Sequence, residues 1–149
     1  MRDNRYHYTK ECVNRLVRDF YKHNNIIIAV DFDNTLYNFM RRGYSQAIIH
    51  LLQKLAPKWH GVTKTYPQGV DNRFTILLYT AREDFELLKA KNICDDLNIR
   101  IDYTNETPSN IDFPVTTKPF YNILLDDKAG LGQAYKVLTK FLKVIDYEY

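Results

Sequence analysis

Five consecutive apolar residues, Ile26–Val30, restrict the possible folds of this 149-residue chain more than any other feature. Four of the five are β-branched, and the run leads directly into Asp31 and Asp33. An unbroken apolar run of this length is typical of a strand buried on both faces of a parallel sheet. Ligands of open α/β sheets bind just beyond the carboxyl ends of such strands. We therefore expect both aspartates at the mouth of a sheet, although a lone strand end followed by an Asx turn is the simpler interpretation.

Strand and helix patterns alternate along the rest of the chain, which predicts a parallel sheet with helices on both faces. Further strands are expected at residues 74–79, 99–104 and 121–125, and helices at 9–22, 44–55, 83–97 and 130–142. Residues 144–147 are expected to add an edge strand, and residues 36–43 a loop above the aspartates. The predicted fold class is α/β, a three-layer Rossmann-like domain over residues 1–149. Within it, residues 1–25 form an N-terminal extension with one helix, residues 26–149 form the core, and any cap is minimal or absent.

Composition narrows the class of protein. The formal charge of +3 and the pI of about 8.8 suit an anionic substrate without establishing nucleic-acid binding. Cys12 and Cys94 form no CxxC pair and predict buried thiols in a reducing compartment, so we expect a cytoplasmic protein. The residues after Met1 are polar, and no apolar run approaches membrane-spanning length. Neither a signal peptide nor a membrane partner is therefore expected.

Polar residues follow three of the predicted strands, namely Asp31 and Asp33, then Thr80, then Asp126 and Asp127, with Lys118 ahead of the last strand. Because the carboxyl ends of neighbouring parallel strands meet at one edge, we expect these side chains to converge. Four carboxylates at one point cannot all ionise without compensation, and Mg²⁺ held by carboxylates, water and a phosphate is the natural remedy. One carboxylate can then attack phosphorus while a second protonates the leaving alkoxide and later deprotonates water.

The run Asp31-Phe32-Asp33-Asn34-Thr35 resembles the first motif of the haloacid dehalogenase (HAD) superfamily, whose members are mostly phosphatases. The similarity spans roughly residues 26–135. Thr80 matches the second motif, Lys118 is the best match to the third, and Leu124-Leu125-Asp126-Asp127 matches the fourth. Residues 117–121 and 125–129 together resemble a small branch of capless HAD hydrolases found in phages and bacteria. The resemblance implies a HAD-like fold whose residues 26–149 form the catalytic core.

The resemblance also implies a role for each matched residue. Asp31 is the implied nucleophile, and Asp33 is the implied general acid and base, which also lends its backbone carbonyl to the metal. Asp126 is the implied direct ligand of Mg²⁺ with Asp127 in support, so the expected metal group is Asp31, Asp33, Asp126 and Asp127. Lys118 is expected to hold both the nucleophile and the phosphate, and the residues expected to bind the phosphate are Thr80, Ala81, Arg82 and Lys118. Asn34 stands where glycine is commoner in the family.

These expectations favour a Mg²⁺-dependent phosphomonoesterase that works through a phosphorylated Asp31. An open site and a mildly basic charge favour a nucleotide or a nucleic-acid-end phosphate as substrate, with a sugar phosphate or another small metabolite as the alternative. A second copy of the chain completing the open site is a further expectation. Arg41 and Arg42 either meet a phosphate through their planar guanidinium groups or are solvated surface charges.

Two other classes of protein remain open. One is a non-catalytic binding or regulatory protein that keeps the HAD fold, with the helix at residues 9–22 as an interaction surface rather than a packing element. The presence of every motif residue argues against it. The other is a receiver-like phospho-acceptor domain, which also gathers Asp, Thr and Lys at strand ends. The position of the Asp-x-Asp pair at the first predicted strand disfavours that class.

Overall fold

A four-stranded parallel sheet forms the centre of the molecule. The computed structural model describes residues 4–66, 73–108 and 120–147, with side chains from residue 8 onward. The strands are β1 (Ile26–Val30), β4 (Phe74–Leu78), β5 (Tyr103–Thr104) and β6 (Ile123–Leu125), in the spatial order β5-β4-β1-β6. Every residue of β1 and β4 is buried. The prediction of an α/β fold with a parallel sheet built around Ile26–Val30 is therefore confirmed.

Strand β1 is paired on both sides, which explains its unbroken apolar sequence. Its last residue, Val30, lies opposite Leu78 of β4 and Leu125 of β6. Alternate side chains then enter different clusters: Ile28 joins the main core, and Ile27 joins a smaller cluster on the opposite face. A central strand of this kind needs apolar residues at every position because neither face meets water.

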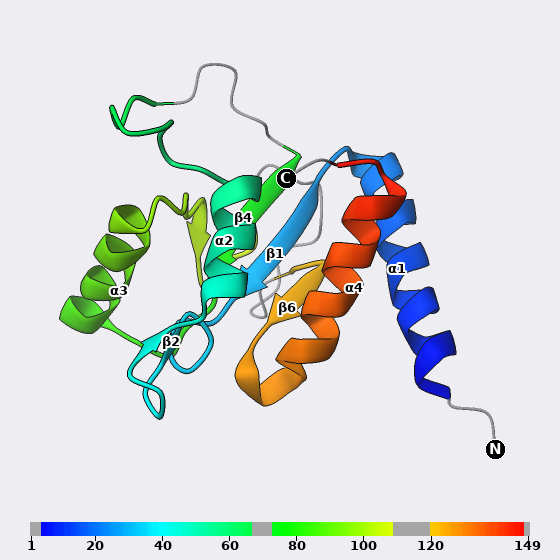
Figure 1. Ribbon diagram of the computed structural model, residues 1–149, viewed down its shortest axis with the longest axis horizontal. Helices are drawn as coiled ribbons and strands as arrows, with labels where there is room; N and C mark the ends of the chain where they lie inside the picture. The colour runs from blue at the N-terminus through cyan, green and yellow to red at the C-terminus, as the bar shows by residue number, and fades with distance from the viewer. Residues whose placement is uncertain (1–3, 67–72, 109–119, 148–149) are drawn as a thin grey trace.

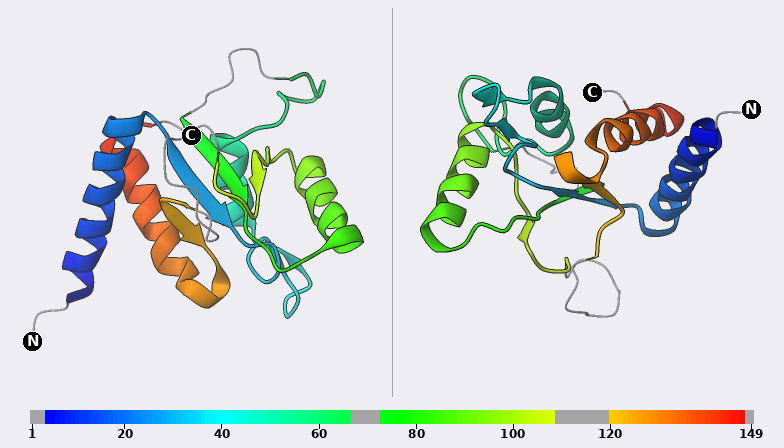
Figure 2. Two further views of the ribbon diagram at one scale, coloured as in Figure 1. Left: turned by 180° about the vertical axis from the view of Figure 1, so that it is seen from behind. Right: turned by 90° about the horizontal axis from the view of Figure 1, so that it is seen from below.

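Four helices accompany the sheet: α1 (Asn4–His23), α2 (Gln46–Leu55), α3 (Asp84–Asp96) and α4 (Leu131–Val144). Figures 1 and 2 show α2 and α4 over one face, α3 beside the β5 edge, and α1 against α4 beyond β6. Their buried apolar side chains all belong to the main core cluster. They include Val13, Leu16, Phe20, Ile48, Ile49, Leu51, Leu52, Leu55, Ala90, Cys94, Val137, Leu138, Phe141 and Leu142.

The prediction of helices on both faces is wrong for the residues that the structure describes. The crossovers through α2 and α3 move the chain in the same direction across the sheet, from β1 to β4 and on to β5. Because parallel crossovers are right-handed, both helices lie on the same face. Over the described ranges, the second face carries a small cluster with aromatic side chains and no helical residue; the cluster is Ile27, Ala29 and Leu77 with Tyr79, Tyr103, Phe120, Tyr121 and Leu124 around it.

Two predicted strands are shorter than expected because side chains replace backbone partners. In the 99–104 segment, Asp102 Oδ2 accepts a hydrogen bond from Ile76 N at 2.8 Å, and Arg100 donates to the Phe74 carbonyl at 2.7 Å. In the 121–125 segment, Asn122 Oδ1 accepts from Ile27 N at 2.7 Å. Because side chains take up these backbone hydrogen bonds, the regular strands of the two segments are limited to Tyr103–Thr104 and Ile123–Leu125.

The expected edge strand at residues 144–147 is not formed. Val144 ends α4, and Tyr147 N donates to the Leu142 carbonyl at 2.9 Å. Asp146 adopts φ 54°, the left-handed conformation that commonly ends a helix. The chain therefore folds back on α4, which lets the Tyr147 ring pack edge-on against Phe74 with centroids 5.0 Å apart.

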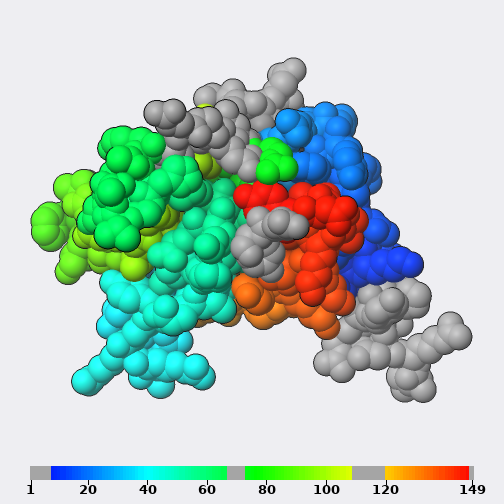
Figure 3. Space-filling view, turned by 45° about the horizontal axis from the view of Figure 1, so that its top comes forward, coloured from blue at the N-terminus to red at the C-terminus, as the bar shows by residue number. Residues whose placement is uncertain are grey.

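The segment after Asp33 is a small hairpin rather than an irregular loop. Strand β2 (Tyr37–Asn38) pairs antiparallel with β3 (Gly43–Tyr44), and the Tyr37 ring lies between Phe39 and Tyr44 with centroid distances of 5.1 and 5.2 Å. Figure 3 shows this hairpin, α2 and the loop that follows α2 on one face of the molecule. The hairpin starts immediately beyond the carboxyl end of β1.

Helix α1 is a packing element of the core. Its Asp19 carboxylate accepts a hydrogen bond from the Asn122 amide at 3.3 Å, and Thr9 is hydrogen-bonded to Gln133 of α4. Of the two free thiols, Cys94 is buried and Cys12 is half-buried. Burial raises the pKa of Cys94 to about 12. No helix in the described residues is long and apolar enough to cross a membrane.

Removal of a buried leucine in α2 should strongly destabilise the fold. Leu52 is fully buried in the main core, so Leu52→Ala should lower the free energy of unfolding by about 2–5 kcal/mol. Leu88 of α3 is 55% exposed, so Leu88→Ala should change it by about 0.5 kcal/mol or less. Urea unfolding of both variants measures the difference. Equal losses would contradict the packing of α2 described here.

Candidate metal and phosphate site

Three carboxylates converge at the carboxyl ends of β1 and β6. Asp31, Asp126 and Asp127 each offer a carboxylate oxygen, and these three atoms all lie within 4.8 Å of one another. The backbone explains the convergence, since Asp31 N donates to the Leu125 carbonyl at 3.0 Å and thereby ties the two strand ends together. The predicted meeting of Asp31 with Asp126 and Asp127 is confirmed.

A buried threonine hydroxyl positions Asp127. Thr35 is fully buried, and its Oγ1 accepts a hydrogen bond from Asp127 N at 3.0 Å and lies 3.5 Å from Asp127 Oδ1. Thr35 follows β1, whereas Asp127 opens the 3₁₀ helix η1 (Asp127–Ala129) after β6. This contact therefore fixes the acids of one strand end relative to those of the other.

Asp126 is oriented by its own turn. Its Oδ1 accepts a hydrogen bond from Lys128 N at 2.9 Å, so the side chain caps η1. Asp126 is half-buried and Asp127 is exposed. The group therefore opens toward solvent on the Asp127 side.

The environment of Asp31 disfavours its charge. Partial burial, followed by the neighbouring Asp126 carboxylate, raises the pKa of Asp31 to about 6. A hydrogen bond from the Phe32 backbone works in the opposite direction, and Asp33 and Asp127 add smaller repulsions. A cation beside the carboxylates would remove this penalty. Three carboxylate oxygens at this separation fit a hard divalent ion such as Mg²⁺, which takes oxygen ligands and usually keeps several waters.

Asp33 lies near the three carboxylates but is paired with arginine. The Arg82 guanidinium donates to both Asp33 oxygens, with Nη2 to Oδ1 at 2.7 Å and Nε to Oδ2 at 2.9 Å. Arg82 also contacts Glu86 at 3.3 Å and lies 4.6 Å from the centroid of the Phe32 ring. The bonds to Asp33 raise the pKa of Arg82 above its usual value. The metal role of the Asp33 carbonyl and the phosphate role of Arg82 stay predictions.

Thr80 follows β4 at the same edge of the sheet. Tyr79 N donates to the Val30 carbonyl at 2.9 Å, which aligns the end of β4 with that of β1. Asn105 holds the Thr80 backbone on both sides, accepting from Thr80 N and donating to its carbonyl at 2.9 Å each. Thr80 Oγ1 accepts from Arg82 N at 3.1 Å, so its own proton can be donated elsewhere. Ala81, between them, is exposed.

Asn34 has a backbone reason to be where it is. Its φ is 60°, a left-handed conformation that glycine and asparagine adopt most readily. Its side-chain oxygen accepts a hydrogen bond from Phe39 N at 3.2 Å. Asn34 thus turns the chain from β1 into the hairpin and anchors it. Lys118, the predicted third-motif lysine, lies outside the described residues.

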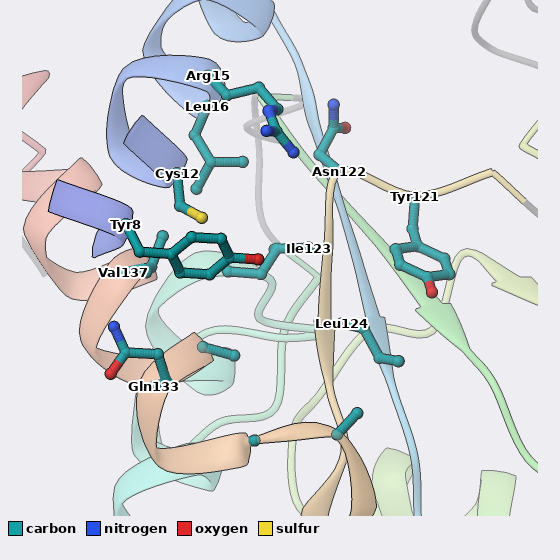
Figure 4. A pocket seen from close by; sticks show the side chains of 13 residues that line it. Tyr8, Cys12, Arg15, Leu16, Tyr121, Asn122, Ile123, Leu124, Gln133 and Val137 are labelled. Atoms are coloured by element: carbon teal, nitrogen blue, oxygen red, sulfur yellow. The ribbon is translucent and has the colours of Figure 1, made fainter. Parts of the chain in front are cut away.

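Sequence reasoning missed a pocket between α1, β6 and α4. It measures about 430 Å³, and the acidic group takes no part in lining it. Figure 4 shows Tyr8, Cys12 and Leu16 of α1 opposite Ile123 of β6 and Val137 of α4. The α1 sequence predicts a packing face or an interaction surface but no pocket, because an apolar stripe at helical spacing does not reveal where packing is incomplete.

Comparison with known proteins adds nothing to the geometry described above. No match is found among protein-family models, curated proteins or solved structures.

Stability of the metal-free protein should depend on the charge of Asp31. The fold raises the pKa of Asp31 and therefore favours its neutral carboxyl. This contribution to the free energy of unfolding is fully present below about pH 4 and is lost as the pH rises through about 6. Asn at this position mimics the neutral form, so in EDTA the Tm of Asp31→Asn should exceed that of the wild type by roughly 2–4 °C near neutral pH, with the gap closing at about pH 4.

Thermal unfolding across this pH range provides the measurement. Asp96→Asn, on the exposed end of α3, is the matched control and should follow the wild type. A gap that is constant with pH would contradict the repulsion among these carboxylates.

Proposed function

We propose that this protein is a Mg²⁺-dependent phosphomonoesterase of HAD type. The observation that carries the proposal is the gathering of Asp31, Asp126 and Asp127 within 4.8 Å beside a threonine and an arginine. Acids alone would support cation binding only. Thr80 and Arg82 add the hydroxyl and guanidinium donors that recognise a phosphoryl group.

Asp31 is the nucleophile in this proposal. Its carboxylate oxygen forms a bond to phosphorus as the bond from phosphorus to the leaving alkoxide breaks. Asp33 protonates that alkoxide and then takes a proton from the water that attacks the acyl phosphate. A divalent cation held by Asp31, Asp126 and Asp127 supplies charge neutralisation at the phosphoryl oxygens. Lys118 is proposed to hold the phosphate and the nucleophile.

Arg82 has a partner in the site when no substrate is bound, namely Asp33. Its guanidinium binds Asp33 in a bidentate pair, a geometry that a phosphoryl group matches equally well. An entering phosphate dianion therefore competes for Arg82 and leaves Asp33 available to the alkoxide. Thr80 is positioned to donate its hydroxyl proton to a phosphoryl oxygen, since Oγ1 already accepts from Arg82 N.

The substrate is proposed to be a nucleotide or a nucleic-acid-end phosphate. Over the described ranges, the only strands or helices between β1 and α2 are the two short strands of the hairpin at residues 37–44, and so small an insertion supports a site that is open to a large substrate. A small-metabolite phosphatase is the alternative. A receiver-like phospho-acceptor would keep its acyl phosphate far longer than an enzyme intermediate survives, so the lifetime of that species separates the classes.

Loss of the nucleophile should abolish hydrolysis. Asp31→Asn should reduce turnover of p-nitrophenyl phosphate by about 10³-fold or more, because Asn cannot form the acyl phosphate. EDTA should act similarly on the wild type, with Mg²⁺ restoring activity. Asp96→Asn should turn over normally. Normal turnover by Asp31→Asn would rule this mechanism out.

Removal of the Arg82 guanidinium should weaken binding of the transition state. Arg82→Gln should lower kcat/KM by about 10- to 100-fold, the effect of one charge-assisted hydrogen bond. Arg82→Lys should recover only part of this loss, since lysine keeps the charge without the bidentate geometry. Arg18→Gln, an exposed arginine on α1, is the control. An unchanged kcat/KM in Arg82→Gln would remove Arg82 from the site.

A further inference from the structure

The positive charge of this chain is concentrated in one segment. Residues 34–70 contain no Asp or Glu but hold five Lys and Arg residues, so the rest of the chain carries −2 of the net +3. The five are Arg41, Arg42, Lys54, Lys58 and Lys64. In the structure this segment supplies the hairpin, α2 and the loop at residues 56–66. We call residues 37–66 of this segment, which begin with the hairpin, the basic face.

Most cations of the basic face are free to meet a ligand. Arg41, Arg42, Lys54 and Lys64 are exposed, and none forms an ion pair with a described acid. Lys58 differs, because its ammonium group is paired with Asp95. Unpaired cations in an acid-free stretch produce a positive potential that attracts polyanions.

Exposed aromatic and apolar side chains lie near these cations in the sequence. At the hairpin, Phe39 is 51% exposed and Met40 is 92% exposed, beside Arg41 and Arg42. At the other end, Tyr66 is 73% exposed. Large apolar side chains in solvent beside unpaired cations are typical of surfaces on which nucleobases stack.

A pocket and a tryptophan lie at the far end of α2. The pocket measures about 470 Å³ and is lined by His50, Lys54, Trp59 and His60 among others. The start of the loop is held in place by Asn98, whose side-chain oxygen accepts from Trp59 N at 2.7 Å. Lys64 Nζ lies 5.3 Å from the Trp59 ring centroid. The loop therefore presents cations and rings from a supported backbone.

The two ends of the basic face are joined through α2. Its ten residues span about 15 Å, and His50 and Lys54 are exposed along it. Figure 3 shows the hairpin, α2 and the loop as one continuous surface. Asn34 N donates to the Tyr37 carbonyl at 2.7 Å, which attaches the hairpin to the acidic site. A ligand on this surface thus reaches the acids at one end.

We propose that the basic face binds a single-stranded nucleic acid, which runs along α2 from the hairpin to the Trp59 loop. Its phosphates lie against the unpaired cations and its bases contact Phe39 and Tyr66. Several nucleotides fit this length, well beyond a mononucleotide at the acidic site. That the strand offers its terminal phosphate to Asp31 rests on the proposed function, whereas binding itself does not.

Binding is tested without catalysis, in EDTA, by fluorescence anisotropy of a labelled oligothymidylate of about 12 nucleotides. Lys54→Gln/Lys64→Gln should weaken binding about tenfold at low salt and reduce the slope of log K against log salt by about 1.4. Lys10→Gln/Lys22→Gln on α1 removes the same charge elsewhere and should bind as the wild type does. Trp59 is the only tryptophan, and its emission should change on binding.

The role of the bases is tested with an abasic oligomer of equal length and with a fully paired duplex. Both should bind about tenfold or more weakly than the single strand, and Phe39→Ser and Tyr66→Ser should weaken the single strand selectively. Equal binding of the abasic oligomer, or equal loss in the two lysine variants, would overturn the proposal. Because hydrolysis takes no part, an inactive protein that binds would contradict only the proposed function.

Discussion

Mutual repulsion among carboxylates is the constraint on which the site depends. The parallel pairing of β1 with β6 forces Asp31 toward Asp126 and Asp127, because Asp31 N is bonded to the last residue of β6. The core thus holds together groups that would separate in water. Fold stability supplies the free energy that keeps the acids adjacent, and a bound cation would return part of it.

The charged side chains of the site form two separate groups. Three acids face one another, whereas Asp33 faces Arg82, which in turn stacks on Phe32 and contacts Glu86. Asp31 and Asp33 are two residues apart, and alternation along an extended chain would point both side chains the same way. The bidentate pairing of Asp33 with Arg82 gives the two carboxylates different partners. The proposed nucleophile and the proposed acid therefore occupy different electrostatic surroundings, as a two-step phosphoryl transfer requires.

Sequence alone predicted those features that depend on local pattern. Ile26–Val30 is recognisable because a strand buried on both sides must be apolar throughout, and the acids at Asp126 follow a similar run. Features decided by long-range partners were missed. Three such features are the pairing of Arg82 with Asp33, the hydrogen bond from Ile76 N to the Asp102 side chain, and the return of Tyr147 onto α4. Each joins residues far apart in the sequence or overrides the strand that the local sequence predicts.

Helix α1 lies alongside β6, one of the two outer strands of the described sheet, and Asp19 of α1 accepts a hydrogen bond from Asn122, the residue before β6. An outer strand offers unpaired backbone groups to any other extended chain, and natural proteins cover or interrupt such edges. Helix α1, which precedes the proposed site residues in the sequence, therefore covers this edge of the sheet. A shortened chain beginning near Ile26 would retain every proposed site residue and yet be prone to add strands from its neighbours and aggregate.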